Sequence, residues 1–277
     1  MIELTGDWQE MPQGKVRARV VQRVAWLVLQ EEPANSYSYA MMRDLDEAVL
    51  AARFDDGVDV LVLCGAGEKF FCAGADIGML QEVTPRWKYS FCLHANETML
   101  RLEHTPKLVI AALNGHCVGG GLEVALAADI RLARATPEGG KGGRIGLPEV
   151  KLGVLPGTGG TQRLARLLGP SRAMKMMVEA STYTPEDALA EGLVHELLPA
   201  EGFEEAVQAY ARRFTAPHAA SMAVGNIKRA VQSGADLPLE SGLALERELQ
   251  QRLFESADAK EGLAAFLEKR PAEFEGR

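Results

Sequence analysis

Three short, nearly continuous apolar runs constrain the fold more than any other feature. They are VDVLVLC at 58–64, KLVIAAL at 107–113 and IRLA at 130–133. A strand that is buried on both faces has this composition, which is typical of a parallel sheet covered by helices. Segments with apolar residues at helical spacing, at 39–52 and 87–103, lie among these runs. Strands that alternate with helices predict right-handed crossovers and an α/β core.

The two ends of the chain have different patterns. Residues 16–30 carry two β-branched apolar stretches, VRARVV and VAWLVLQ, which predict a hairpin or a bent strand. Strand signals vanish from about Glu201, and the remaining apolar residues recur at helical spacing. We therefore expect an α/β core in residues 1–200 and a helical region in residues 201–277. The apolar faces of those helices must be buried against the core or against a neighbouring subunit.

Composition excludes several classes of protein. The chain has 277 residues, of which 47% are hydrophobic and 25% charged, as in an ordinary globular protein. Its net charge of −8 argues against nucleic-acid binding. The four cysteines form no C-x-x-C pair and no histidines stand at metal-ligand spacing, so we expect reduced thiols, no metal site and a cytoplasmic location. No apolar run reaches the length of a membrane span, and the polar N-terminal stretch does not resemble a secretory signal.

Two glycine-bearing loops follow apolar runs. FFCAGAD at 70–76 comes after the first run, and NGHCVGGG at 114–121 comes after the second. Neither is a P-loop, a complete G-x-G-x-x-G or a G-x-S-x-G elbow. Glycine lets backbone N–H groups approach a ligand, and a helix N-terminus adds free N–H groups. Two such groups aimed at one carbonyl oxygen form an oxyanion hole, and ligands of α/β sheets lie at these strand ends.

Two glutamates stand beside these glycines. Glu123, in GGGLEVALAA, could be a capping-box acid, but its apolar neighbours leave no polar face for it to occupy. Burial of a carboxylate is unfavourable unless it is paired or neutral, so Glu123 is a candidate for proton transfer. Glu149 precedes a second glycine-rich turn in GLPEVKLGVLPGTGG. Two acids beside an oxyanion hole suit proton transfer at the α and β carbons of a carbonyl compound.

Three segments that contain these glycines and glutamates resemble the signature blocks of the enoyl-CoA hydratase/isomerase family, the crotonase superfamily. The segments are FFCAGADIGML, ALNGHCVGGGLEVALAADIRLA and GLPEVKLGVLPGTGGTQRL, and the resemblance extends from about residue 16 to residue 274. It implies that residues 1–200 are a spiral of ββα units that forms the acyl-CoA-binding catalytic core. It also implies that residues 201–277 are a helical region that completes the coenzyme A site and forms homotrimers, often paired into hexamers. It also implies an acyl-CoA thioester as substrate, a role in fatty acid metabolism, and no metal or separate cofactor, since coenzyme A is part of the substrate.

The resemblance also assigns roles to residues. Carried over position by position, the oxyanion-hole N–H groups fall on Ala73 and Gly120, and the catalytic carboxylates fall on Glu123 and Glu149. The other positions that it places against the substrate are Ala75, Asp76, Ile77 and Gly157. The first three would meet the adenine end of coenzyme A, and Gly157 would line the water and acyl site. The position of Asp76 is more typical of a residue that stabilises a loop than of a ligand.

The implied reaction is hydration of a 2-trans-enoyl-CoA to a 3-hydroxyacyl-CoA. Glu123 would orient and deprotonate water while Glu149 delivers the α proton, or the two roles would be reversed or shared. An isomerase that uses mainly one carboxylate, a hydratase-lyase and a decarboxylase are alternatives on the same scaffold. A catalytically inactive RNA-binding or scaffold relative is an alternative of another class. The negative charge and the presence of both acids disfavour it.

Several other features bear on the site. PANSYSYAM at 33–41 stands where the family usually has NAL, near the expected path of pantetheine. The stretch 134–145 is longer than usual: it either shapes the acyl pocket or is a surface loop, and the second interpretation is favoured slightly. His116 lies between the glycines and is expected to be structural. The candidate cations for the phosphates of coenzyme A, none of them preferred, are Lys228, Arg229, Lys260, Lys269 and Arg270.

Overall fold

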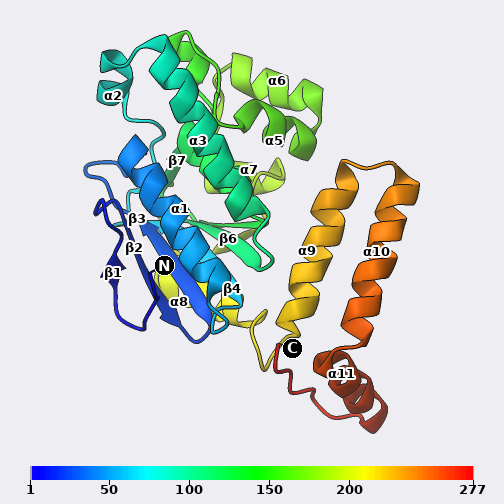
Figure 1. The fold of residues 1–277 in the computed structure, drawn as a ribbon. Coiled ribbons are helices and arrows are strands. Elements are labelled where there is room, and N and C mark those ends of the chain that lie inside the picture. The colour runs from blue at the N-terminus through cyan, green and yellow to red at the C-terminus, as the bar shows by residue number, and fades with distance from the viewer. Residues whose placement is uncertain (1, 277) are drawn as a thin grey trace.

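The computed structural model describes residues 2–276 and contains two β-sheets (Figure 1). The larger sheet consists, in spatial order, of β1 (Gln9–Glu10), β2 (Val16–Val21), β3 (Val24–Leu29), β4 (Val60–Gly65), β6 (Leu108–Leu113), β8 (Ile130–Arg134) and β11 (Glu196–Leu198). The smaller sheet consists of β10 (Thr182–Tyr183), β9 (Ile145–Gly146), β7 (His116–Val118) and β5 (Phe70–Cys72). From β3 to β11 all neighbours in the larger sheet are parallel, whereas β1, β2 and β3 pair antiparallel. The expected hairpin and parallel α/β core are confirmed.

The chain builds these sheets in a repeating order. One turn contains β4, β5, α2 (Ile77–Glu82) and α3 (Pro85–Glu103), and the next contains β6, β7 and α4 (Gly120–Leu126). The third contains β8, β9, the 3₁₀ turn η1 (Glu149–Leu152) and α5 (Gly160–Leu168). Each turn therefore gives one strand to each sheet before its helix, which is the expected spiral of ββα units. The strands β5 and β7 lie in segments that the sequence pattern predicts as loops.

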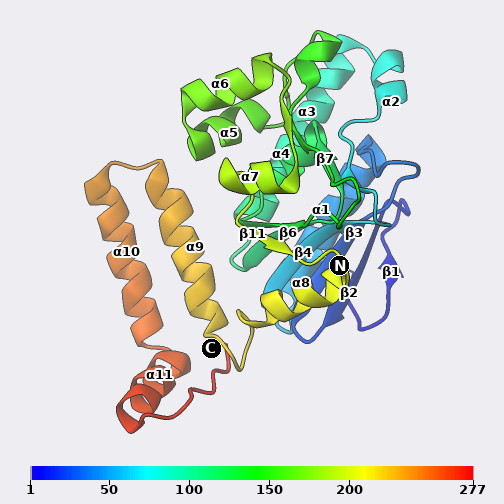
Figure 2. The ribbon, with the colours of Figure 1, turned by 180° about the vertical axis from the view of Figure 1, so that it is seen from behind.

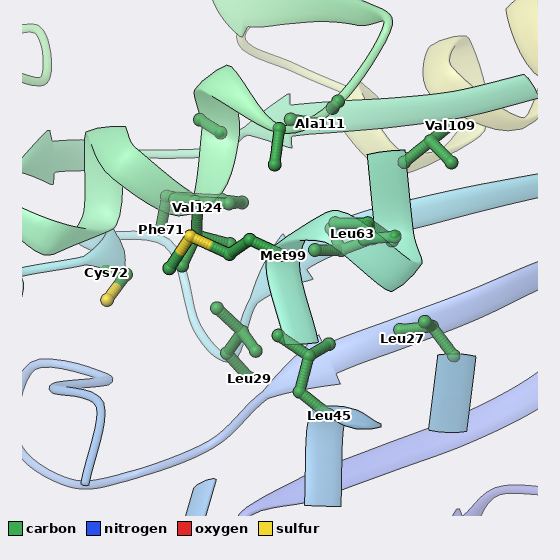
Figure 3. Packing of buried hydrophobic residues seen from close by; sticks show 14 of the residues in the cluster. Leu27, Leu29, Leu45, Leu63, Phe71, Cys72, Met99, Val109, Ala111 and Val124 are labelled. Carbon is green, nitrogen blue, oxygen red and sulfur yellow. The ribbon is translucent and has the colours of Figure 1, made fainter. Parts of the chain in front are cut away.

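The larger sheet is buried on both faces. α1 (Tyr39–Phe54) and α3 cover one face, and Figure 3 shows Leu27, Leu63 and Met99 in the packed layer between. Both helices begin at hydroxyl caps: Ser38 accepts the N–H of Met41, and Thr84 accepts the N–H of Trp87. On the opposite face, α8 (Phe203–Arg212) packs on the alternate residues of the same strands. This two-sided burial explains the continuous apolar runs.

The last three helices extend away from the sheets (Figures 1 and 2). They are α9 (Ser221–Ala235), α10 (Leu239–Phe254) and α11 (Ala257–Glu268), and α6 (Pro170–Val178) and α7 (Pro185–Ala190) complete the part of the chain before α8. The projecting helices expose large apolar residues, among them Phe254, Leu263, Phe266 and Leu267. The division at residue 200 stays a prediction: α8 still packs on the sheet, α9 contacts the core through the ion pair of Lys228 with Asp129, and α10 and α11 project outward.

The described residues lack two features that would indicate other classes of protein. In residues 2–276, no helix is both long and apolar enough to cross a membrane. The same residues contain no group of three or more His, Cys, Asp and Glu side chains that could hold a metal ion. All four cysteines are free, and Cys64, Cys72 and Cys117 are buried.

Candidate active site

A cavity of about 470 Å³ brings together the three glycine-bearing segments of the sequence. Its walls come from the segment after β5, the N-terminus of α4 and the segment from Pro148 to Thr158. Seven of the eight predicted site residues line this cavity: Ala73, Ala75, Ile77, Gly120, Glu123, Glu149 and Gly157. The remaining wall is mainly apolar, with Leu80, Leu152, Val154 and Leu155. The cavity is therefore suited to an apolar group attached to a polar reacting centre.

The glycines before Glu123 allow close packing that no other residue would permit. A Cβ atom on Gly120 would overlap the ring of Tyr37, and one on Gly121 would overlap the carbonyl oxygen of Cys72. α4 can therefore begin directly against β5 and against the segment that contains Tyr37. This contact brings the third residue after Gly120, Glu123, to the floor of the cavity, where its side chain is 2% exposed.

The carboxylate of Glu123 has three hydrogen-bond donors. Its Oε1 accepts the backbone N–H groups of Thr158 at 2.8 Å and Gly160 at 2.7 Å. Its Oε2 accepts the hydroxyl of Thr158. Gly160 is the first residue of α5, so the positive end of that helix dipole faces the carboxylate. These donors compensate the unfavourable burial of a negative charge.

Glu149 has a different environment. It begins η1 directly after Pro148, and its Oε2 is buried with no hydrogen-bond partner among residues 2–276. Burial raises the pKa of Glu149 to about 7, and the negative charge of Glu123 adds to the effect of burial. A carboxyl group with this pKa is partly protonated near neutral pH, and it can serve as a general acid.

The structure corrects the assignment of one oxyanion-hole donor. The N–H of Ala73 donates to the carbonyl oxygen of Ala34 at 3.1 Å, so this N–H is occupied within the fold. Tyr37 instead bonds to both neighbours of Ala75: its N–H donates to Gly74 O at 2.9 Å, and its carbonyl oxygen accepts the N–H of Asp76 at 3.1 Å. In a parallel pair, a residue flanked in this way directs its own N–H away from the partner strand. Ala75 thus has the N–H that is available to the cavity.

The second donor segment lies against the first. Gly120 is the first residue of α4, where backbone N–H groups lack partners within the helix. Gly74, directly before Ala75, has a φ of +92°, and a Cβ on it would lie 3.0 Å from the nitrogen of Gly120. This close approach places the Ala75 segment beside the N-terminus of α4. Sequence reasoning could not choose between Ala73 and Ala75, because the choice depends on pairing with Tyr37.

Three other expectations concern residues near the cavity. Asp76 does not line the cavity but caps α2, where its carboxylate accepts the N–H of Met79 at 3.1 Å. His116 lies in β7, and its Nδ1 accepts the N–H of Arg144 at 3.0 Å. Its ring lines a separate cavity of about 100 Å³, together with part of the stretch 134–145. Asp76 is thus a helix cap and His116 a hydrogen-bond acceptor in this structure, while residues 134–144 are exposed or partly exposed.

Two of the candidate phosphate ligands already have carboxylate partners. Lys228 is buried, and its Nζ lies 2.8 Å from Asp129. The guanidinium of Arg270 pairs with Glu261 at 2.6 Å and Glu268 at 2.7 Å. Lys228 thus joins the helical region to the core, and Arg270 forms ion pairs within that region. Neither can bind a phosphate without giving up its ion pairs.

Two polar side chains at the site were missed by sequence reasoning. Tyr37 lines the cavity and its hydroxyl lies 2.9 Å from the hydroxyl of Thr158. The two residues are 121 positions apart. The only sequence signals were the departure from NAL at 33–41 and a threonine within the glycine-rich turn, and neither indicates that the side chains meet.

Several known proteins are similar to this chain in sequence and in fold. A family model for enoyl-CoA hydratase/isomerase matches residues 20–277. A crotonyl-CoA hydratase of Syntrophomonas wolfei is 34% identical over 240 residues, which cover 87% of this chain and 89% of that protein. A 2,3-dehydroadipyl-CoA hydratase of Escherichia coli is 36% identical over 262 residues, which cover 92% and 96%. The crystal structure of an enoyl-CoA hydratase from Geobacillus kaustophilus aligns with a TM-score of 0.90 at 44% identity and covers 95% of this chain and 97% of that one.

Proposed function

The chain belongs to the enoyl-CoA hydratase/isomerase family and is an enoyl-CoA hydratase. We propose that two glutamates and two backbone N–H groups catalyse its reaction. Water would add across the 2,3 double bond of the thioester to give a 3-hydroxyacyl-CoA. The observation that carries this proposal is the pair of unlike carboxyl groups in one cavity. Glu123 is held by three donors, whereas Glu149 has a pKa raised to about 7.

The proposed oxyanion hole consists of the N–H groups of Ala75 and Gly120. Negative charge develops on the thioester oxygen when water attacks C3 and the electrons of the double bond move toward the carbonyl. Two N–H groups that are already in place stabilise this charge without reorganisation, and loss of one such donor typically lowers the rate by about 10²–10³-fold. The close contact between Gly74 and Gly120 supports this pairing, because it brings the two segments together.

The two carboxyl groups would share the proton transfers. Glu123 accepts a proton from water as the water oxygen forms its bond to C3. Glu149, in its protonated form, gives a proton to C2 of the resulting enolate. One proton enters the enzyme and one leaves it, so exchange between the two acids or with solvent completes the cycle. The raised pKa of Glu149 supports its role as the acid, and the N–H groups that anchor Glu123 support its role as the base.

The remaining features of the proposal concern assembly and location. The substrate is an acyl-CoA thioester, and we expect a homotrimer or homohexamer in which the exposed apolar residues of α10 and α11 are covered. Apolar residues on a projecting helix are usually buried in the functional assembly. No nucleic acid, metal or separate cofactor is proposed, and fatty acid metabolism and a cytoplasmic location stay predictions from the sequence.

The direct test is hydration of crotonyl-CoA, followed by the loss of absorbance of the conjugated thioester. We expect turnover by the parent and a loss of at least about 10²-fold in Glu123→Gln and in Glu149→Gln, as for removal of a general base or acid. Binding of a saturated acyl-CoA by both variants is the control for an intact cavity. A parent that binds acyl-CoA but hydrates no enoyl-CoA, or a Glu149→Gln variant with the parental rate, would contradict the proposal.

A further inference from the structure

A chain of buried hydroxyl groups leads to Glu123. The hydroxyl of Tyr37 lies 2.9 Å from Thr158 Oγ1, and the hydroxyl of Thr158 donates to Glu123 Oε2. All three side chains are almost fully buried, with exposures of 2% for Tyr37, 1% for Thr158 and 2% for Glu123. Buried hydroxyls require partners, and in this chain of hydrogen bonds each hydroxyl has one.

The direction of each hydrogen bond follows from the number of protons. An ionised carboxylate only accepts hydrogen bonds, so the single hydroxyl proton of Thr158 must point to Glu123. Thr158 then has lone pairs but no proton for Tyr37, and the tyrosine hydroxyl must donate to Thr158. Burial raises the pKa of Tyr37 and the charge of Glu123 raises it further, so the tyrosine keeps this proton. The order of donation is Tyr37 to Thr158 to Glu123.

Thr158 holds both oxygens of the carboxylate. Its backbone N–H donates to Oε1 and its hydroxyl donates to Oε2. Oε1 also accepts the N–H of Gly160, which leaves the remaining lone pair of Oε2 as the position from which Glu123 can bind water. Rotation of the carboxylate would break these bonds, so the hydroxyl of Thr158 determines which way the basic lone pair points.

Tyr37 connects this arrangement to the proposed oxyanion hole. Its backbone bonds to Gly74 and Asp76, on either side of Ala75. Its ring lies so close to Gly120 that a Cβ there would overlap it. A phenylalanine would fill the same volume beside Phe91, whose ring centroid lies 5.9 Å away, but it would have no hydroxyl. The hydroxyl therefore serves a purpose other than packing.

We infer that Tyr37 and Thr158 are positioning residues that together orient the carboxylate of Glu123 toward its water. This inference rests on the proposed role of Glu123 as the base. Thr158 acts directly on the carboxylate, and Tyr37 acts through Thr158. Neither residue needs to exchange a proton with the substrate, so the effect is expected on the rate of the chemical step rather than on the affinity for acyl-CoA.

The test compares hydroxyl-deleting variants with a hydroxyl-retaining one. Tyr37→Phe and Thr158→Val remove a hydroxyl with little change in volume, and Thr158→Ser keeps it. We expect kcat for crotonyl-CoA to fall by about tenfold in Tyr37→Phe and by about 10–100-fold in Thr158→Val, as for loss of a hydrogen bond to a neutral and to a charged group. Thr158→Ser should keep kcat within about threefold of the parent, and KM should change less than kcat in all three variants.

Two further readouts separate positioning from packing. Because Tyr37 acts through Thr158, the double variant should be no slower than Thr158→Val alone, whereas independent effects would multiply. Loss of the Thr158 hydroxyl removes a donor to the ionised form of Glu123. Thr158→Ser keeps this donor, so it should retain most of the kcat that Thr158→Val loses.

The outcomes that overturn the inference are distinct from a failure of the proposed function. Parental kcat in Tyr37→Phe and Thr158→Val, with activity lost in Glu123→Gln, would reject the positioning role and leave the function intact. Multiplicative losses in the double variant would reject the relay. If Tyr37→Phe fails to fold, the difference between Thr158→Val and Thr158→Ser decides whether the hydroxyl on the carboxylate orients it.

Discussion

The cavity contains two carboxyl groups whose surroundings differ sharply. On the Glu123 side, two backbone N–H groups and a hydroxyl meet the carboxylate, and the N-terminus of a helix faces it. On the Glu149 side, one oxygen is buried with no hydrogen-bond partner among the described residues, and burial raises the pKa to about 7. Burial alone therefore does not determine what an acid does in this site. The number of donors that accompany the burial separates a fixed base from a proton donor.

The variants with the largest expected effects test the difference between Glu123 and Glu149 directly. Glu123→Gln and Glu149→Gln should each lower kcat by about 10²–10⁴-fold, but their stabilities should diverge. Glu123→Gln replaces charge-assisted hydrogen bonds by neutral ones and should lower the free energy of unfolding by about 1–3 kcal/mol. Glu149→Gln removes no such bond, and at pH 8 it replaces a buried charge that disfavours the folded state, so it should raise that free energy rather than lower it. Urea unfolding at pH 8 measures both values.

The unfolding free energies of the two variants decide whether the fold supports Glu123 and Glu149 differently. If Glu149→Gln destabilised the protein as much as Glu123→Gln, the two carboxylates would be equally supported by the fold, and the contrast between them would be wrong.

A second pair of variants compares two glycines that line the cavity. Gly120→Ala would place a Cβ inside the ring of Tyr37, and such overpacking typically costs about 1–3 kcal/mol. Because the ring of Tyr37 and the N–H of Gly120 would both move, we expect activity to fall by at least about 10²-fold. Gly157→Ala is the matched control: the nearest atom to its Cβ would be 3.7 Å away, so thermal unfolding should be close to that of the parent. Equal effects of the two variants would contradict the close packing at Gly120.

The pH dependence of the rate sharpens the assignment of the acid. Burial raises the pKa of Glu149, so the group is protonated below about pH 7 and ionised above it. A reaction that requires its protonated form should have a kcat/KM that falls above about pH 7, by up to about tenfold per pH unit. The residual activity of Glu149→Gln should lack this limb. If Glu149→Gln kept the same limb, the titrating group would be another residue.

The smallest effect on kcat is expected from substitution of His116, which contacts neither Glu123 nor Glu149. Burial and the nearby Lys69 and Arg144 lower its pKa, so the ring is mainly neutral at neutral pH and accepts the N–H of Arg144. The oxygen of an asparagine can accept the same bond, so His116→Asn should keep kcat within about twofold of the parent. A loss comparable to that of Glu149→Gln would assign His116 a role in catalysis.

Much of this fold could be predicted from the sequence. Strands β4, β6 and β8 are buried on both faces, so each is a continuous apolar run, and helices α1 and α3 show apolar residues at helical spacing. Strands β5, β7 and β9 were not predicted, because two or three residues cannot show a period. Both candidate acids could be named, since an acid among apolar residues and glycines is unusual.

The fine geometry of the site could not be predicted in the same way. The choice between the N–H groups of Ala73 and Ala75 depends on how the chain pairs with Tyr37, which is a property of the folded backbone. The hydrogen bond between Tyr37 and Thr158 joins residues 121 positions apart, and no local pattern reports such a contact. Local periodicity therefore predicts elements, whereas the site depends on the register between them.

The support of Glu123 also has a consequence for how the protein tolerates mutation. Two of its three donors are backbone N–H groups, at Thr158 and Gly160, and a change of side chain does not remove a backbone donor unless it introduces proline. Only the hydroxyl of Thr158 is encoded by a side chain. The backbone donors therefore persist when the side chain of Thr158 changes, but a Cβ on Gly160 would lie 3.1 Å from Glu123 Cγ, so the position of the base depends on the codons of both residues.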